Sequence, residues 1–196
     1  IVLATAAPAI SGSTNLALLL GLDAGRIMQI MVLGTAAFPL TVMPILLLAP
    51  QIGTLSDVIA SAGLVLLVIL TATALGFALR ARLFPAPSQH QIQTLDGASV
   101  LAFAVIVIAL MAPLNAALRA DPAQVALWAL LAFTISYGLQ AATLLVLRRT
   151  ALHPVAGPLA IGAGNRNIAL FLVALPPETI APILIFIGCW QLPMYL

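Results

Sequence analysis

Two clusters of polar side chains interrupt apolar stretches of this chain and could bind a small ligand. The first cluster consists of Ser13, Thr14 and Asn15. The second consists of Asn165, Arg166 and Asn167. Amide and guanidinium groups donate hydrogen bonds that suit a carboxylate or sulfonate, whereas hydroxyl and amide oxygens can accept from or coordinate a small cation. The clusters therefore predict a binding site for a small anion or a small cation.

Glycine and proline beside each cluster predict that a helix is interrupted there. Pro8 and Gly12 precede the first cluster, and Gly162 and Gly164 precede the second. Such residues are tolerated in a membrane helix where polar groups satisfy the freed backbone. If each helix breaks just before Gly12 or Gly164, two half-helices begin with unpaired N–H groups and a positive dipole end. These N-termini favour anions, whereas exposed half-helix carbonyls could hold a small cation.

Arg166 is the one charged residue that the sequence places in the middle of an apolar stretch. An arginine at the bilayer centre costs about 2.5–3.5 kcal/mol on insertion scales. The carboxylates all fall near the ends of such stretches: Asp23, Asp57, Asp96, Asp121 and Glu178. We expect Arg166 to meet a substrate carboxylate or sulfonate, or to replace a bound cation. The alternative is an arginine that donates hydrogen bonds to backbone carbonyls of the unwound neighbouring segment.

The composition defines the elements that position these clusters. Of 196 residues, 63% are hydrophobic and 6% are charged, against about 25% charged in a soluble domain. This excludes a soluble enzyme domain, a disordered chain and a nucleic-acid binder, and indicates an all-α membrane protein. A span needs roughly 20 apolar residues. The predicted spans are 1–22, 26–48, 58–79, 97–118, 123–147, 154–175 and 179–196.

The arginines predict how these spans are oriented. Seven spans place Arg26, Arg80, Arg82, Arg148 and Arg149 on one side, and Arg119 on the other. The basic side is predicted to be cytoplasmic, so the first span runs inward and the sixth outward. The connector 80–96, rich in polar residues and proline, is expected to be a surface loop.

The two interrupted stretches also resemble each other. The segment 12–20 aligns with 164–172, matching glycine, asparagine, alanine and two leucines in register. A chance match in Leu/Ala-rich sequence is the alternative. Because the two copies lie five spans apart, they would cross the membrane in opposite directions, which is typical of an inverted-repeat transporter whose site lies at the breaks.

At these residues the chain resembles the bile acid:sodium symporter family. The stretch from Pro8 to Asn15 is similar to the motif of the family's fourth helix, and Gly162 to Asn167 to that of its ninth. The resemblance implies ten helices in two inverted repeats, with two crossed, discontinuous helices. It makes residues 1–48 the last two helices of a first repeat that is truncated at its N-terminus, and 49–196 the five helices of the second.

The resemblance also implies an ion site that this chain alters. Thr14 and Asn15 would occupy sodium-site positions, and Asn167 matches the closing asparagine of the second motif. Gly162 stands where the family has a sodium-binding glutamate, and Arg166 where it has a glutamine. Two like charges about 4 Å apart at an effective dielectric of about 20 repel by about 4 kcal/mol. We therefore expect the fold without firm sodium coupling, and no other cofactor.

The expected function is secondary transport of an organic anion by alternating access. Arg166 would bind or balance the anion, and Ser13, Thr14, Asn15, Asn165 and Asn167 would orient it. Coupling to sodium, coupling to protons and uncoupled transport all remain open. The alternatives are an arsenite-type efflux carrier, which needs a thiolate near the breaks where Cys189 does not fall, and a non-transporting membrane protein that binds a ligand.

The expected partners and location follow from the same features. The partners are a small organic anion and the lipid bilayer, with no nucleic acid. We expect no enzyme activity, because the sequence holds no Ser–His–Asp arrangement, metal-ligand spacing or phosphate-binding glycine loop. The predicted location is a bacterial inner (plasma) membrane, with the arginine-rich connectors in the cytoplasm.

Overall fold

Helices dominate the parts of the chain that the computed structural model describes, residues 2–10, 12–47, 55–175 and 177–195, and no strand forms within them. The helices are α1 (Val2–Ala6), α2 (Gly12–Leu19), α3 (Ala24–Leu47), α4 (Leu55–Leu83), α5 (Gln89–Ala120), α6 (Pro122–Leu147), η1 (His153–Val155), α7 (Ala156–Gly164), η2 (Ile168–Leu170), α8 (Phe171–Ala174), α9 (Pro177–Ile180), η3 (Ala181–Ile183), α10 (Leu184–Trp190) and α11 (Leu192–Tyr195).

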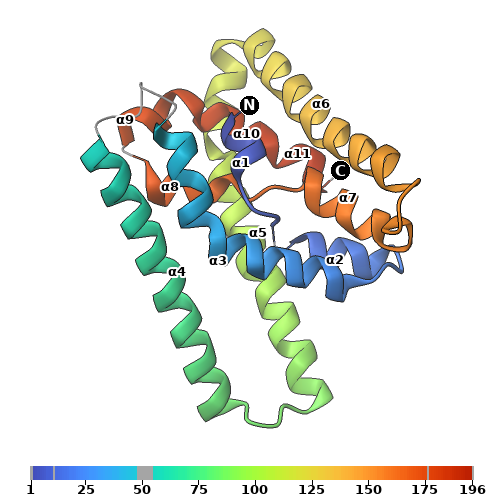
Figure 1. The fold of residues 1–196 in the computed structure, drawn as a ribbon. Helices are drawn as coiled ribbons and strands as arrows, with labels where there is room; N and C mark the ends of the chain where they lie inside the picture. The colour runs from blue at the N-terminus through green and yellow to red at the C-terminus, as the bar shows by residue number, and fades with distance from the viewer. Residues whose placement is uncertain (1, 11, 48–54, 176, 196) are drawn as a thin grey trace.

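Four of these helices, α3 to α6, are long and apolar enough to cross a membrane (Figure 1). This is consistent with the predicted all-α membrane class. The stretches 1–22 and 154–175, which were predicted to be interrupted, are each divided into shorter helices. The prediction of one unbroken span over 179–196 is wrong within the described residues, because this stretch is also divided into shorter helices. Proline contributes to these divisions, since it lacks a backbone donor. Pro8 follows α1, Pro182 lies in η3 and Pro193 lies in α11.

The long helices begin at side chains that cap their N-termini. Ser88 and Gln91 form a reciprocal capping box at the start of α5, and the Asp121 carboxylate accepts from Gln124 N at 2.9 Å at the start of α6. The predicted surface loop 80–96 is therefore wrong in extent. Helix α4 continues to Leu83 and α5 begins at Gln89, so the loop is only 84–88.

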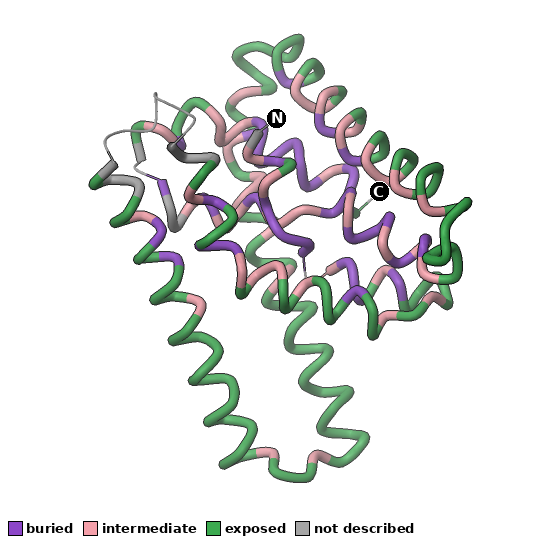
Figure 2. The backbone as a smooth tube through the Cα atoms, viewed as in Figure 1, coloured by how far each residue is buried: buried purple, intermediate pink, exposed green. Residues whose placement is uncertain are grey.

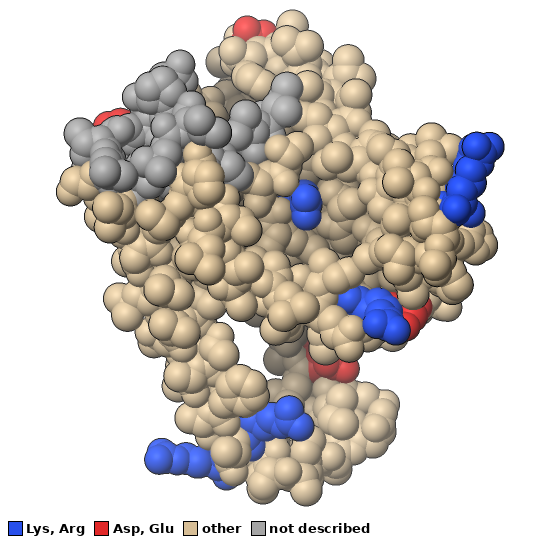
Figure 3. All heavy atoms as spheres, viewed as in Figure 1, with Lys and Arg blue, Asp and Glu red and all other residues tan. Residues whose placement is uncertain are grey.

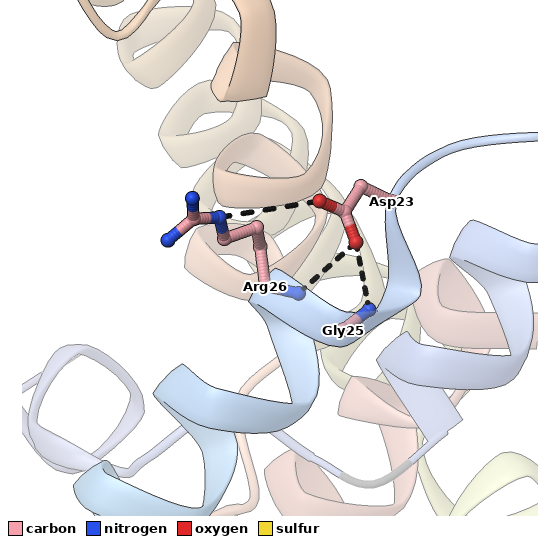
Figure 4. A network of polar contacts seen from close by, with 3 residues as sticks. All are labelled: Asp23, Gly25 and Arg26. Atoms are coloured by element: carbon pink, nitrogen blue, oxygen red, sulfur yellow. Dashed lines mark hydrogen bonds and ion pairs between the residues drawn. The ribbon is translucent and has the colours of Figure 1, made fainter.

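Asp23 caps α3 in the same way (Figure 4). Its Oδ1 atom accepts from Gly25 N at 3.0 Å and from Arg26 N at 3.4 Å. The Arg26 Nε atom lies 4.0 Å from Asp23 Oδ2, and both side chains are more than half exposed. An exposed pair of this kind contributes little to stability, so Asp23 acts mainly as the cap.

The core lies where the short helices pack among α3, α5 and α6 (Figure 2). Phe38 of α3 meets Phe171 of α8 edge-on, with ring centroids 5.2 Å apart. Phe186 of α10 lies 5.7 Å from the ring of Trp128 and 5.7 Å from that of Trp190. The core therefore holds the ends of the chain together, whereas the C-terminal half of α4 and the N-terminal half of α5 are exposed.

Charged side chains lie mostly at the periphery of an apolar surface. Figure 3 shows basic atoms near the turn where α4 meets α5 and along one outer edge of the molecule. Arg80 and Arg82 occupy the last turn of α4. The expected boundary between the two repeats, at 48/49, lies outside the described residues.

Candidate functional site

Two extended segments far apart in the sequence, around Ala9 and around Arg166, lie side by side and pair in antiparallel fashion. This pairing is called the crossing below. Ala9 and Arg166 form an isolated antiparallel bridge. The Ile10 N–H donates to the Asn165 carbonyl at 2.9 Å, and the Asn167 N–H donates to the Pro8 carbonyl at 2.8 Å. The backbone groups freed by each interruption are thus used by the other segment, as the low-dielectric interior of a membrane protein requires.

The two interruptions are placed differently relative to their glycines. Helix α2 begins at Gly12, as expected, but α7 continues through Gly164, and helix resumes only at Ile168. The expected half-helix start at Gly164 is therefore wrong. The Asn165 N–H still closes the last turn of α7 on Ile161 O at 3.0 Å. The aligned segments 12–20 and 164–172 accordingly differ in local structure.

Small residues allow the crossing to be close. A Cβ atom on Gly162 would lie 3.7 Å from Ala9 Cβ, and one on Gly34 of α3 would lie 3.3 Å from Pro8 Cβ. On the other side, a Cβ on Gly164 would lie 2.6 Å from the Ser136 carbonyl oxygen and would overlap Gln140 Cγ. Gly164 is thus required by the approach of α7 to α6.

Arg166 is bound to its surroundings through both its backbone and its side chain. One guanidinium nitrogen donates to the Thr5 carbonyl, in the last turn of α1, at 3.1 Å. The Arg166 carbonyl accepts from Trp190 Nε1 at 3.1 Å. The cation therefore faces the negative end of a helix, and its Nε donor is buried without a partner.

Buried hydroxyl and amide groups surround the crossing. Ser136 Oγ donates to the Gly164 carbonyl at 3.1 Å, and Gln140 Nε2 donates to Ser136 Oγ at 3.5 Å. Ser13 Oγ donates to the Asn165 carbonyl at 3.5 Å. Thr14 Oγ1 and Asn165 Oδ1 are buried without a hydrogen-bond partner. Of these two residues, Asn165 lines a cavity described below and Thr14 does not.

A cavity of about 690 Å³, called the large cavity below, opens beside the N-terminus of α2. Its wall is mainly apolar and comes from α2, α5, α6 and α11. None of the described residues that line it is charged. Its polar wall residues are Asn15, Tyr137, Gln140, Asn165 and Tyr195. An apolar wall with a few converging polar groups is typical of a small-molecule site.

A second cavity, of about 230 Å³ and called the small cavity, lies beside Arg166. Asn167 and Gln191 add amide groups to its wall, and Phe103, Ile168 and Met194 add apolar surface. A void of about 10 Å³ lies against Ser13 and Asn165.

The predicted site residues are thus divided between separate cavities. Asn15 and Asn165 line the large cavity, and Arg166 and Asn167 line the small one. Thr14 and Gly162 line none of the three cavities described above. The sequence analysis did not select Tyr137, Gln140 or Tyr195. Only packing of α5, α6 and α11 around the crossing makes these three visible.

The ion site expected at Thr14, Asn15 and Gly162 offers few ligands in the described part of the chain. Among the described residues, no group of three His, Cys, Asp or Glu side chains could hold a metal ion. Thr14 Oγ1 is an oxygen donor that a monovalent cation could use, but Gly162 brings no side chain.

These features define the chain as an all-helical bundle, with helices able to cross a membrane, built around an antiparallel crossing of two extended segments. No protein family, curated protein or solved structure matches the chain.

Proposed function

We propose that this protein is a secondary transporter that moves an organic anion across the membrane by alternating access. The observation that carries the proposal is the pairing of Ala9 with Arg166 next to the 690 Å³ cavity in an apolar helical bundle. Interrupted helices with a ligand cavity at their crossing suit a transporter, because they bring backbone dipoles to a site inside the membrane. In this proposal α1–α2 and α7–α8 are the discontinuous helices of an inverted repeat, with its repeats at 1–48 and 49–196.

The electrostatics around the crossing support an anionic substrate. The large cavity includes Gly12, the first residue of α2, where backbone N–H groups and the helix dipole favour negative charge. Arg166 is the charged residue of the small cavity, and its Nε atom has no partner. No carboxylate is among the described residues that line either cavity. A carboxylate or sulfonate would therefore be favoured over an amine.

Arg166 also supports transport that does not depend on sodium. Its charge lies beside the bridge and faces the end of α1. A fixed guanidinium there repels a cation at Thr14 and Asn15 and supplies positive charge to the substrate itself. The arginine-rich connectors are taken as cytoplasmic in this proposal.

The test is uptake by the full-length protein in proteoliposomes. The labelled probes are a set of monocarboxylates and a set of monosulfonates, each tested with and without an inward sodium gradient. Uptake that is indifferent to sodium and lost in Arg166→Gln is expected. The control is Arg26→Gln, which removes an exposed arginine of the same type. Sodium-dependent uptake would refute the role of Arg166, and saturable binding without flux would identify a non-transporting receptor instead.

A further inference from the structure

The two cavities share part of their lining and extend from it along different segments. The large cavity is lined by α2, which leads from the crossing toward Asp23. The small cavity is lined by η2, which leads from the crossing toward α8. Both are also lined by α5, where the large cavity reaches back to Val100 and the small cavity reaches forward to Leu110. The two cavities are therefore neighbours that meet at the residues they share.

A shared wall separates the two cavities. Four residues line both cavities: Phe103, Val107, Met194 and Tyr195. Two belong to the long helix α5 and two to the four-residue helix α11. We propose that Tyr195 is the gate of this wall, and that its movement joins the two cavities into one passage for substrate. The proposal rests on the proposed transport function and names the residue that controls passage.

Tyr195 is the member of the wall best able to move. Its side chain is 50% exposed, whereas Met194 is 9% exposed. Its hydroxyl oxygen lies 3.8 Å from the position of a Cβ on Gly12, so it reaches across to the start of α2. The 10 Å³ void also lies against it. Half-exposed side chains change rotamer quickly, whereas packed ones are held by their neighbours.

Gating by Tyr195 would separate the substrate's two polar environments. With the ring in its present position, a ligand at Asn15 or Asn165 is on the other side of the wall from Arg166. When the ring turns aside, the route from the large cavity to the Arg166 guanidinium is open. One aromatic side chain would then decide whether an anion held at α2 can reach the fixed positive charge.

The experiment measures passage directly, by cysteine labelling in proteoliposomes of the full-length protein. The background carries Cys189→Ala. Reporter cysteines are placed at Val100→Cys in the large cavity and at Ala169→Cys in the small one. A membrane-impermeant thiol reagent is added to one face at a time. In the parent, the face that labels Val100→Cys rapidly is expected to label Ala169→Cys slowly.

Tyr195→Ala is expected to raise labelling of Ala169→Cys from that face. Since a minor open state is populated at about 0.1–10%, opening the wall permanently should raise the rate by about tenfold or more. Labelling of Val100→Cys should not change. Tyr137→Ala is the matched control, because Tyr137 is 45% exposed and lines only the large cavity. Tyr195→Phe should keep the parent's slow rate.

The outcomes separate this proposal from the transport proposal. An unchanged Ala169→Cys rate in Tyr195→Ala would refute the gate even if uptake is normal. A raised rate without any anion uptake would keep the gate and refute the transporter. If Tyr195→Ala does not fold, Tyr195→Leu removes the ring's reach while keeping an apolar side chain. The labelling rates of Val100→Cys and Ala169→Cys in that variant then test the gate.

Discussion

The indole Nε1 of Trp190 donates a hydrogen bond of 3.1 Å to the carbonyl oxygen of Arg166. Arg166 therefore pairs with Ala9 on one side of the extended segment and with a fully buried tryptophan on the other. Its side chain adds a third attachment, at Thr5. The crossing is held by groups from α1, the extended segment and α10, so its geometry depends on residues far from either cluster.

Trp190→Phe should destabilise the full-length protein. It removes one of the two donors to the Arg166 carbonyl, since the Ile168 N–H still donates to it at 3.0 Å. A lost hydrogen bond of this kind costs about 0.5–1.5 kcal/mol, and the smaller ring also leaves space where the indole was. The measurement is thermal unfolding in detergent followed by circular dichroism. Trp128→Phe is the control, since Trp128 is only partly buried. Equal losses in the two variants would contradict the role given to the Trp190 hydrogen bond.

Arg166→Gln should lower stability as well as uptake. The variant loses a charged donor to Thr5 O, and such hydrogen bonds contribute about 1.5–3 kcal/mol. Arg166→Lys should retain part of this, because the ammonium can still face the end of α1. Melting temperatures of the three proteins test the order. A Lys variant no more stable than the Gln variant would show that the charge itself is not what matters.

Gly164→Ala should be poorly tolerated. The added methyl would meet the Ser136 carbonyl and Gln140 Cγ, and overpacking of this kind costs about 1–3 kcal/mol. Gly138→Ala, on the α6 helix that Gly164 approaches, has nothing within 4 Å of the added atom. It should be neutral or slightly stabilising, by up to about 1 kcal/mol from helix propensity. Similar unfolding curves for both variants would disprove the close contact.

Cys189→Ala should leave transport unchanged. Cys189 is fully buried in α10, its Sγ lies 3.7 Å from the Val125 carbonyl, and it lines none of the three cavities described above. A thiolate that binds arsenite has to be accessible. Anion uptake equal to that of the parent is the expected result. Arsenite efflux that disappears in Cys189→Ala would instead favour the arsenite carrier.

The helical class and the four long helices could be predicted because they depend on local composition. Continuous apolar runs of the length of α4, α5 and α6 have few alternatives in a chain with so few charges. The stretch 179–196 was predicted as one span for the same reason, and this failed. Its prolines are visible in the sequence, but the packing of Gly188 against α5, where a Cβ would lie 3.0 Å from Leu110 O, belongs to tertiary structure.

The candidate site was predictable only in part. The polar runs at Ser13 and Asn165 lie beside the two interruptions, at the start of α2 and just after the end of α7, because glycine and polar side chains are local signals. They could not indicate that Asn165 and its neighbour Arg166 would line different cavities, since that depends on how the bridge turns successive side chains to opposite sides. Nor could any local sequence pattern indicate that Tyr195 lies at the site, because Tyr195 approaches Gly12 only in the folded structure.

Helices α4 and α5 contain 29 and 32 residues, or roughly 44 and 48 Å at 1.5 Å per residue. A hydrocarbon layer is about 30 Å thick, so this hairpin must tilt or extend into the headgroups, where Arg80 and Arg82 can reach lipid phosphates. A thinner bilayer would increase the tilt. Because α5 also carries Phe103 and Val107, which line both cavities, a change in the tilt of α5 would move part of the wall that the proposed gate closes.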